Sequence, residues 1–231
     1  MTRLVLVRHG ESIWHGDNRY AGSSDVRLSE TGTRQAAELA GWAVNAGLTA
    51  VWSSPMTRTL ETAGPVAALA NLPVHSDERL RELAFGDGEG KTIAEMRQLF
   101  PQEVAAFLER PATHHLPGGE PPGDGVARAM AAIDEITADK SDGRVMVVMH
   151  STLLRLVLCH LLGLPLDSYR RVFPNVGNAR ITEVRLNDGV ESLLQFNSPA
   201  GVDTHEAQPA AGPVLRRRPG SAPDMTPSGG A

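Results

Sequence analysis

Residues 3–10 read Arg3-Leu4-Val5-Leu6-Val7-Arg8-His9-Gly10, an uninterrupted apolar run that ends in two basic side chains and a glycine. An apolar run without polar alternation is typical of a strand buried on both faces of a mostly parallel sheet. Residues 144–149 have the same character and end at His150, and a shorter run, 50–52, ends at Ser53 and Ser54. The sequence therefore predicts buried strands that each end in polar or basic residues.

Between these strands the apolar residues recur at helical spacing. Ser29 can cap a helix that carries Ala36, Leu39 and Ala40 on one face. Pro55 is expected to open a second helix, which Gly64-Pro65 should kink or break. The remaining predicted elements are a strand at 73–76, helices at 91–110 (interrupted at Pro101), 126–138 and 153–162, and a hairpin of 179–186 with 191–196 around 187–189. This alternation predicts an α/β three-layer sandwich, with a mostly parallel central sheet and helices on both faces.

Length and composition limit the classes of protein that this chain can belong to. The 231 residues suffice for one sizeable domain, which we place at 1–198, and the Pro/Gly/Ala-rich residues 199–231 are predicted to be a disordered tail. A net charge of −5 argues against broad binding to nucleic acid or membranes. The single cysteine, Cys159, excludes an internal disulfide, and the apolar run at 4–7 is too short for a signal peptide. We expect a cytoplasmic protein.

The ends of the predicted strands define a candidate site. Ligands in α/β folds lie beyond the carboxyl ends of the strands, where Arg8, His9, Arg58 and His150 should converge. Guanidinium groups suit phosphate oxygens, and helix N-termini near Ser54 and Ser151 add backbone N–H donors. Two nearby guanidinium groups also keep the imidazole of His9 neutral, and a neutral imidazole is a competent phosphoryl acceptor. A leaving alkoxide would additionally need a carboxylic acid as proton donor.

Several segments share a resemblance to one known family. Residues 8–12 read Arg8-His9-Gly10-Glu11-Ser12, which resembles the signature of the histidine phosphatase superfamily, also called the phosphoglycerate mutase-like family. The further similar segments are 18–22, 28–32, 53–63, 80–90 and 147–151. Together the resemblance covers residues 3–196 and implies the phosphoglycerate mutase-like fold.

The resemblance also implies roles for particular residues. It makes His9 the nucleophile and Glu82 the proton donor, and it assigns Arg8, Arg58 and His150 to binding the phosphoryl group. It implies neither a metal ion nor another cofactor. Glu78 and Glu89 lie close to Glu82 in the sequence and are competing candidates for the acid.

The chain departs from the family pattern at two positions of the site. His15 stands where mutases of the family have Asn, and Ser151 stands where Gly is usual after the second histidine. We expect both side chains, together with Gly22, to contact substrate. The paired His114 and His115 lack further ligands at metal-binding spacing, so they do not indicate a metal site.

These observations favour a phosphatase that acts on a small phosphorylated metabolite. Residues 83–149 contain no adjacent arginine pair of the kind with which the family's mutases grip a substrate carboxylate. A phosphoglycerate-type mutase and a non-catalytic phospho-ligand binding protein remain the alternatives. Neither a nucleic acid nor a membrane is an expected partner, and a homodimer is possible.

Overall fold

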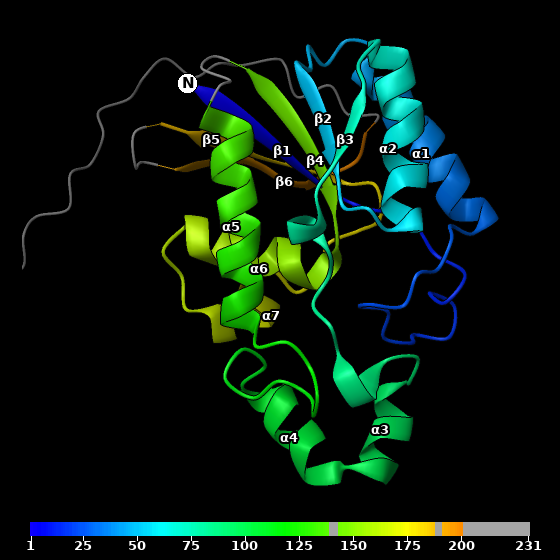
Figure 1. Ribbon diagram of the computed structural model, residues 1–231, viewed down its shortest axis with the longest axis vertical. Coiled ribbons are helices and arrows are strands. Elements are labelled where there is room, and N and C mark those ends of the chain that lie inside the picture. The colour runs from blue at the N-terminus through cyan, green and yellow to red at the C-terminus, as the bar shows by residue number, and fades with distance from the viewer. Residues whose placement is uncertain (139–142, 188–190, 201–231) are drawn as a thin grey trace, which may run out of the picture.

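The computed structural model describes residues 1–138, 143–187 and 191–200. Within them, a six-stranded sheet has the strand order β3-β2-β4-β1-β5-β6 and helices cover both of its faces (Figure 1). The strands are β1 (Thr2–Arg8), β2 (Ala50–Ser53), β3 (Val74–Ser76), β4 (Arg144–Met149), β5 (Ile181–Leu186) and β6 (Ser192–Ser198). The predicted three-layer α/β architecture is confirmed.

Four neighbouring strands of this sheet run parallel. β1 pairs with β4 in the register Leu4↔Val145 and Leu6↔Val147, and β2 pairs in parallel with both β4 and β3. β5 is antiparallel to β1, and β6 is antiparallel to β5. The predicted pairing of the last two strands is therefore confirmed, although residues 188–190 of the predicted turn lie outside the described residues.

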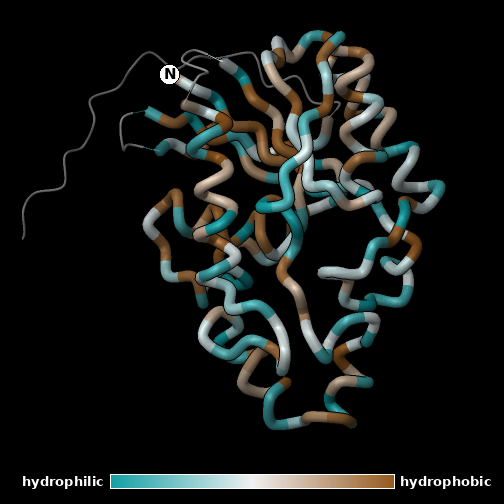
Figure 2. Tube along the Cα trace, viewed as in Figure 1, coloured by the Kyte–Doolittle hydropathy of each residue, from teal (hydrophilic) through white to brown (hydrophobic). Residues whose placement is uncertain are grey.

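The two faces of the sheet carry separate apolar cores. The helices are α1 (Glu30–Ala43), α2 (Thr57–Ala70), α3 (Ile93–Leu99), α4 (Pro101–Glu109), α5 (Pro122–Ala138), α6 (Ser151–Leu161) and α7 (Tyr169–Val172). Val5 and Val7 join the core that contains residues of α1 and α2, whereas Leu4 and Leu6 join the core beneath α5 and α6. Figure 2 shows the resulting concentration of hydrophobic residues along the central strands. Such double burial explains why β1 and β4 lack polar alternation.

The N-termini of α1 and α2 show how well local sequence signals predict the residue at which a helix begins. Ser29 caps α1 as predicted, because its side chain accepts a hydrogen bond from the Gly32 N–H at 3.1 Å. The predicted start of α2 at Pro55 is wrong, since the helix begins at Thr57. Asp25, which is distant in the sequence, accepts hydrogen bonds from the Thr57 N–H and hydroxyl and so fixes this start.

Of the kink or break predicted at Gly64-Pro65, the break is wrong, because α2 continues through Pro65 to Ala70. Pro65 lies on the exposed face, while the neighbouring Ala63, Val66 and Ala67 are buried. Packing of the buried face therefore outweighs the one hydrogen bond that proline removes.

The segments that lead to the candidate site are irregular. Between β3 and α3 the chain forms only two short 3₁₀ turns, η1 (Glu78–Leu80) and η2 (Gly86–Gly88). A third, η3 (Leu166–Ser168), precedes α7. In Figure 1, α3 and α4 lie at the lower end of the molecule, the side toward which β1 runs. Among the described residues, no helix is long and apolar enough to cross a membrane. The predicted tail lies outside the described residues from 201 onward.

One buried ion pair joins the strands that flank β1. Arg144 at the start of β4 donates from Nη2 and Nε to the carboxylate of Glu183 on β5, at 2.6 and 3.1 Å. The exposed fractions are only 7% for Arg144 and 4% for Glu183. The Arg144 guanidinium also lies 5.1 Å from the centre of the Trp42 ring and donates to the Ala46 carbonyl. Loss of the carboxylate would remove the opposite charge of Glu183 and two hydrogen bonds from a buried guanidinium.

We expect Glu183→Gln to lower the free energy of unfolding by about 3–5 kcal/mol, the usual effect of removing one partner of a buried ion pair. Glu78→Gln is the matched control, because Glu78 pairs with Arg81 at the surface and its loss should cost less than about 1 kcal/mol. Urea unfolding of both variants beside the wild type measures the difference. Equal free energies of unfolding for the two variants would contradict the assignment of Arg144 and Glu183 as a stabilising buried ion pair.

Candidate active site

The carboxyl ends of β1, β2 and β4 bring the predicted residues together. The His9 N–H donates to the Met149 carbonyl at 3.0 Å, and the Ser54 N–H donates to the Val148 carbonyl at 3.0 Å. The His9 and His150 rings then lie edge to face, with centroids 5.3 Å apart. Three parallel strands therefore deliver their next residues to one edge of the sheet.

The imidazole of His9 is held in one tautomer. Its Nδ1 lies 2.6 Å from the Gly10 carbonyl oxygen, which can only accept a hydrogen bond, so the proton is on Nδ1 and Nε2 keeps its lone pair. His9 is only 7% exposed. Burial and then the charges of Arg8 and Arg58 hold the pKa of His9 well below its usual range. His9 is thus a neutral imidazole with an unprotonated Nε2.

Gly10 is required by the close approach of α1. A Cβ atom at Gly10 would lie 2.7 Å from the Gly32 carbonyl oxygen, which is too close for a side chain. The Gly10 N–H donates to the Thr62 hydroxyl at 2.9 Å, which ties the strand end to α2. These contacts fix the backbone on which the His9 tautomer depends.

Arg8 has a buried donor without a partner. Its Nη1 donates to the Val176 carbonyl at 2.7 Å, and Nη2 lies 3.4 Å from Nδ1 of His15. Its Nε is buried and makes no hydrogen bond within the described residues. Burial lowers the pKa of Arg8 to about 10, although the charge of Glu82 opposes this shift. An unpaired buried N–H is costly, and an anionic oxygen would satisfy it.

Arg58 lies in the first turn of α2 and is completely buried. It donates from Nη1 to the Ser24 carbonyl at 2.8 Å and from Nη2 to the carbonyls of Ala21 and Gly22 at 3.1 and 3.0 Å. Its Nε donates to Nδ1 of His150 at 3.3 Å. Burial lowers the pKa of Arg58, while the charge of Glu82 raises it.

The contact with Arg58 also determines the tautomer of His150. Because Nδ1 accepts from Arg58, the proton lies on Nε2, which is 2.9 Å from the Ser54 hydroxyl oxygen. His150 is fully buried, and burial followed by the charge of Arg58 holds its pKa well below the usual range. His150 is therefore a neutral donor beside His9. Ser151, the next residue, opens α6 and is half-buried.

Glu82 reaches the site from the irregular segment after η1. Its Oε1 accepts from the N–H groups of Leu83 and Leu153 at 3.0 and 2.9 Å, and its Oε2 accepts from the Thr152 N–H at 2.9 Å. The carboxyl group thus lies at the N-terminus of α6 and is only 7% exposed. Its charge raises the pKa of both Arg8 and Arg58 against the opposing effect of their burial.

The competing glutamates have other surroundings. Glu89 accepts hydrogen bonds from the N–H groups of Gly22, Ser23, Ser24 and Phe85 and from the Ser24 hydroxyl. These bonds lower the pKa of Glu89 despite the opposing effect of burial. Glu78 is exposed and pairs with Arg81. Glu89 therefore anchors the 21–24 loop, and of the three candidates only Glu82 combines burial with contact to α6.

Gly22 and His15 are placed differently from each other. The Gly22 N–H donates to the Glu89 carboxylate, and the Gly22 carbonyl accepts from Arg58. A Cβ at Gly22 would lie 2.0 Å from the Leu83 carbonyl oxygen. Gly22 thus serves as a close backbone contact in this structure, and its role in substrate binding stays a prediction. His15 is half-buried beside Arg8, so its predicted contact with substrate remains compatible with its position.

Arg155 is a cation of this region that the sequence analysis did not identify. It lies one turn into α6, over the Tyr169 ring at 4.7 Å, and donates to the carbonyls of Ser151 and Phe173. Its charge contributes, after burial, to the lowered pKa of Arg8. In the sequence Arg155 lies within an apolar helical run, so no pattern marked it as a site residue. Its position five residues after His150 was the available signal.

The arrangement suits transfer of an anionic group. Arg8, His9, Arg58 and His150 lie at the strand ends or open α2, the charge of the buried Glu82 acts on both arginines, and the Nε of Arg8 has no partner among the described residues. Over residues 1–138, 143–187 and 191–200, no three His, Cys, Asp or Glu side chains are grouped as metal ligands. The charge that a phosphoryl group brings is thus matched by guanidinium groups of the chain itself.

Comparison with known proteins assigns the family. Residues 4–199 match the model of the histidine phosphatase superfamily (branch 1). Phosphoserine phosphatase 1 of Hydrogenobacter thermophilus is 33% identical over 197 residues, which are 85% of this chain and 92% of that protein. The probable phosphoglycerate mutase GpmB of Yersinia pestis is 34% identical over 172 residues, which are 74% of this chain and 80% of that protein.

Solved structures agree with this assignment. Bacillus stearothermophilus YhfR superposes with a TM-score of 0.81 at 31% identity, covering 86% of this chain and 98% of that one. A mycobacterial glucosyl-3-phosphoglycerate phosphatase in complex with VO3 gives a TM-score of 0.77 at 30% identity, covering 85% and 99%. The chain belongs to the histidine phosphatase superfamily (branch 1) and is an enzyme of its phosphoric monoester hydrolase type.

Proposed function

We propose that this chain is a metal-independent phosphatase that hydrolyses the phosphomonoester of a small metabolite through a phosphohistidine on His9. The observation that carries the proposal is the neutral, buried His9, whose Nε2 is unprotonated while Arg8 and Arg58 supply positive charge beside it. Phosphoryl transfer requires mainly positioning and neutralisation of the charge on the phosphoryl oxygens. The Nε of Arg8, which has no partner among the described residues, is a suitable donor to those oxygens, whereas the Nε2–H of His150 is engaged by the Ser54 hydroxyl in this structure.

In the first step, Nε2 of His9 attacks phosphorus and the bond between phosphorus and the leaving oxygen breaks. Glu82 gives its proton to that oxygen, so the product alcohol leaves neutral. A carboxyl group offers about four lone-pair positions, and backbone N–H groups fill three of them on Glu82. The open position on Oε2 is where the transferable proton would reside.

In the second step, the Glu82 carboxylate takes a proton from water, whose oxygen attacks phosphorus. The bond between phosphorus and Nε2 then breaks, inorganic phosphate leaves, and Glu82 is protonated again for the next cycle. One carboxyl group thus serves both half-reactions, first as acid and then as base.

A phosphoglycerate-type mutase is the second candidate, favoured by the similarity to GpmB. It would use the same His9 and Glu82 but would have to return the phosphoryl group to an alcohol instead of water. The absence of an adjacent arginine pair in residues 83–149 supports the phosphatase. A small metabolite as the partner, a cytoplasmic location and a possible homodimer stay predictions, as does the absence of nucleic-acid and membrane partners.

Release of phosphate from p-nitrophenyl phosphate in excess EDTA tests the proposal. We expect wild-type activity to survive EDTA and His9→Ala to lose at least about 1000-fold, because the nucleophile is gone. His160→Ala, which changes an exposed histidine at the other end of α6, should retain activity. Activity that EDTA abolishes, or that His9→Ala retains, would contradict the mechanism.

The acid role of Glu82 predicts a dependence on the leaving group. Glu82→Gln should lower kcat/KM, which reports only the first step, by about 10²–10⁴-fold for alkyl phosphates, since their leaving oxygens need a proton. The effect on kcat/KM for p-nitrophenyl phosphate should be much smaller, because nitrophenolate leaves without protonation. Glu78→Gln on the same segment is the control and should change neither rate. An equal loss on both substrates in Glu82→Gln would argue against the acid role.

A further inference from the structure

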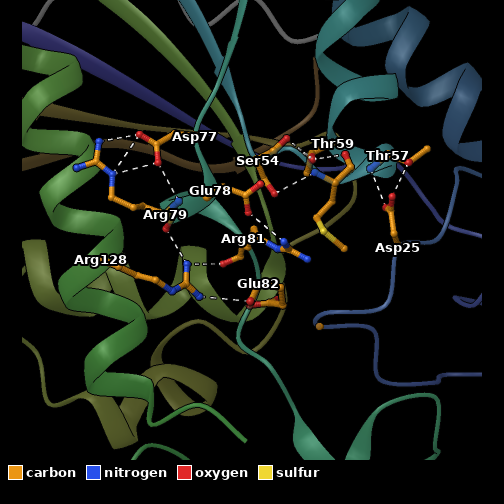
Figure 3. Close-up of polar contacts among 12 residues, drawn as sticks. Asp25, Ser54, Thr57, Thr59, Asp77, Glu78, Arg79, Arg81, Glu82 and Arg128 are labelled. Carbon is orange, nitrogen blue, oxygen red and sulfur yellow. Dashed lines mark hydrogen bonds and ion pairs between the residues drawn. The ribbon is translucent and has the colours of Figure 1, made fainter.

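Arg128 of α5 has all its hydrogen-bonding capacity engaged by one short segment and one glutamate. A guanidinium group carries five N–H donors, and those of Arg128 make five hydrogen bonds. Figure 3 shows the bonds from Arg128 to Arg79, Arg81 and Glu82. Nη1 donates to the carbonyls of Arg79 and Arg81 at 2.6 and 2.7 Å, and Nη2 donates to the Glu82 carbonyl at 3.3 Å. The remaining two bonds, from Nε and Nη2, hold the carboxylate of Glu120 at 2.7 and 2.8 Å.

Two of these carbonyls belong to the peptide groups on either side of the Glu82 Cα atom. The Arg81 carbonyl is in the peptide group before it, and the Glu82 carbonyl is in the one after it. At the other end of the residue, the carboxyl group is held by the N–H groups of Thr152 and Leu153 in α6. Glu82 is therefore fixed from two helices, with its backbone bound to α5 and its carboxyl group bound to α6.

The segment needs an external anchor because it forms little regular structure of its own. Between η1 and η2 the chain makes neither helix nor sheet bonds that would satisfy the carbonyls of residues 81 and 82. Carbonyls in such a segment must find partners elsewhere. The Arg128 and Glu120 side chains are only 23% and 21% exposed, so water screens this pair less than it screens a surface ion pair.

Glu120 keeps the guanidinium in the orientation that these carbonyls require. Its two oxygens bind the Nε and Nη2 edge of Arg128, which leaves Nη1 and the other N–H of Nη2 directed at the carbonyls. Glu120 is itself anchored, because its own N–H donates to the Ala84 carbonyl at 2.8 Å. The loop before α5 thus returns to the segment that carries Glu82.

We propose that Arg128, oriented by Glu120, is the positioning residue for the proton donor Glu82. This inference rests on the proposed function, in which Glu82 protonates the leaving oxygen. A displacement of about 1 Å in a catalytic group can cost about 100-fold in rate. The loss should appear only where proton donation limits the reaction, which separates positioning from a general effect on folding.

The test measures kcat/KM, which reports only the steps up to formation of the phosphohistidine, on aryl phosphates whose leaving groups range from p-nitrophenol to phenol. In Arg128→Ala we expect kcat/KM to fall by about 10–100-fold on phenyl phosphate, with the p-nitrophenyl value within about threefold of wild type. Arg128→Lys should lose less, because one ammonium group can still bind some of the carbonyls. The Glu82→Gln/Arg128→Ala double variant should be no slower on phenyl phosphate than Glu82→Gln alone.

Arg79→Ala is the matched control, because Arg79 also joins the segment to α5, through an ion pair with the exposed Glu135. It should remain within about threefold of wild type on every substrate. If Arg128→Ala does not fold, Glu120→Gln tests the same proposal through the orientation of Arg128. Equal losses across leaving groups, or losses that add to those of Glu82→Gln, would overturn the positioning role. A Glu82→Gln variant without leaving-group dependence would instead refute the proposed function.

Discussion

Complete burial of the Arg58 guanidinium is the constraint on which the site depends. A buried guanidinium must find acceptors, and Arg58 finds them in the carbonyls of residues 21, 22 and 24 and in Nδ1 of His150. These bonds hold the 21–24 loop in place. The N–H groups of residues 22, 23 and 24 in turn donate to the carboxylate of Glu89. The bonds of Arg58 also select the tautomer of His150. One cation therefore fixes both the position of the 21–24 loop and the tautomer of His150.

The distribution of charge explains how the site can work with side chains alone. Burial lowers the pKa values of His9 and His150, so neither adds positive charge, whereas Arg8 and Arg58 stay charged because a guanidinium group is so basic. Glu82 is the buried carboxyl group among these cations. A phosphoryl group entering here meets fixed donors and a neutral nucleophile, which is the preorganisation that lowers a transition-state barrier.

Much of the fold and of the site could be predicted from the sequence. The apolar runs at 3–7 and 144–149 identified the central strands, and their ends located His9 and His150, because parallel strands end at one edge. Contacts distant in the sequence were not predictable: Asp25 starts α2, and buried packing carries α2 through Pro65. Only the structure distinguishes among the three candidate glutamates, because of these Glu82 alone is both buried and bound to the N-terminus of α6. Arg128 left no sequence signal because it binds backbone carbonyls, which every residue has.

The measurement that tests the account most directly is trapping of the phosphorylated enzyme. Rapid acid-free denaturation during turnover of ³²P-labelled substrate, followed by peptide mapping, should recover an acid-labile, base-stable label on the peptide that contains His9. The His9→Ala variant should carry none. Label on another residue, or label that persists in His9→Ala, would contradict the claim that Nε2 of His9 is the nucleophile.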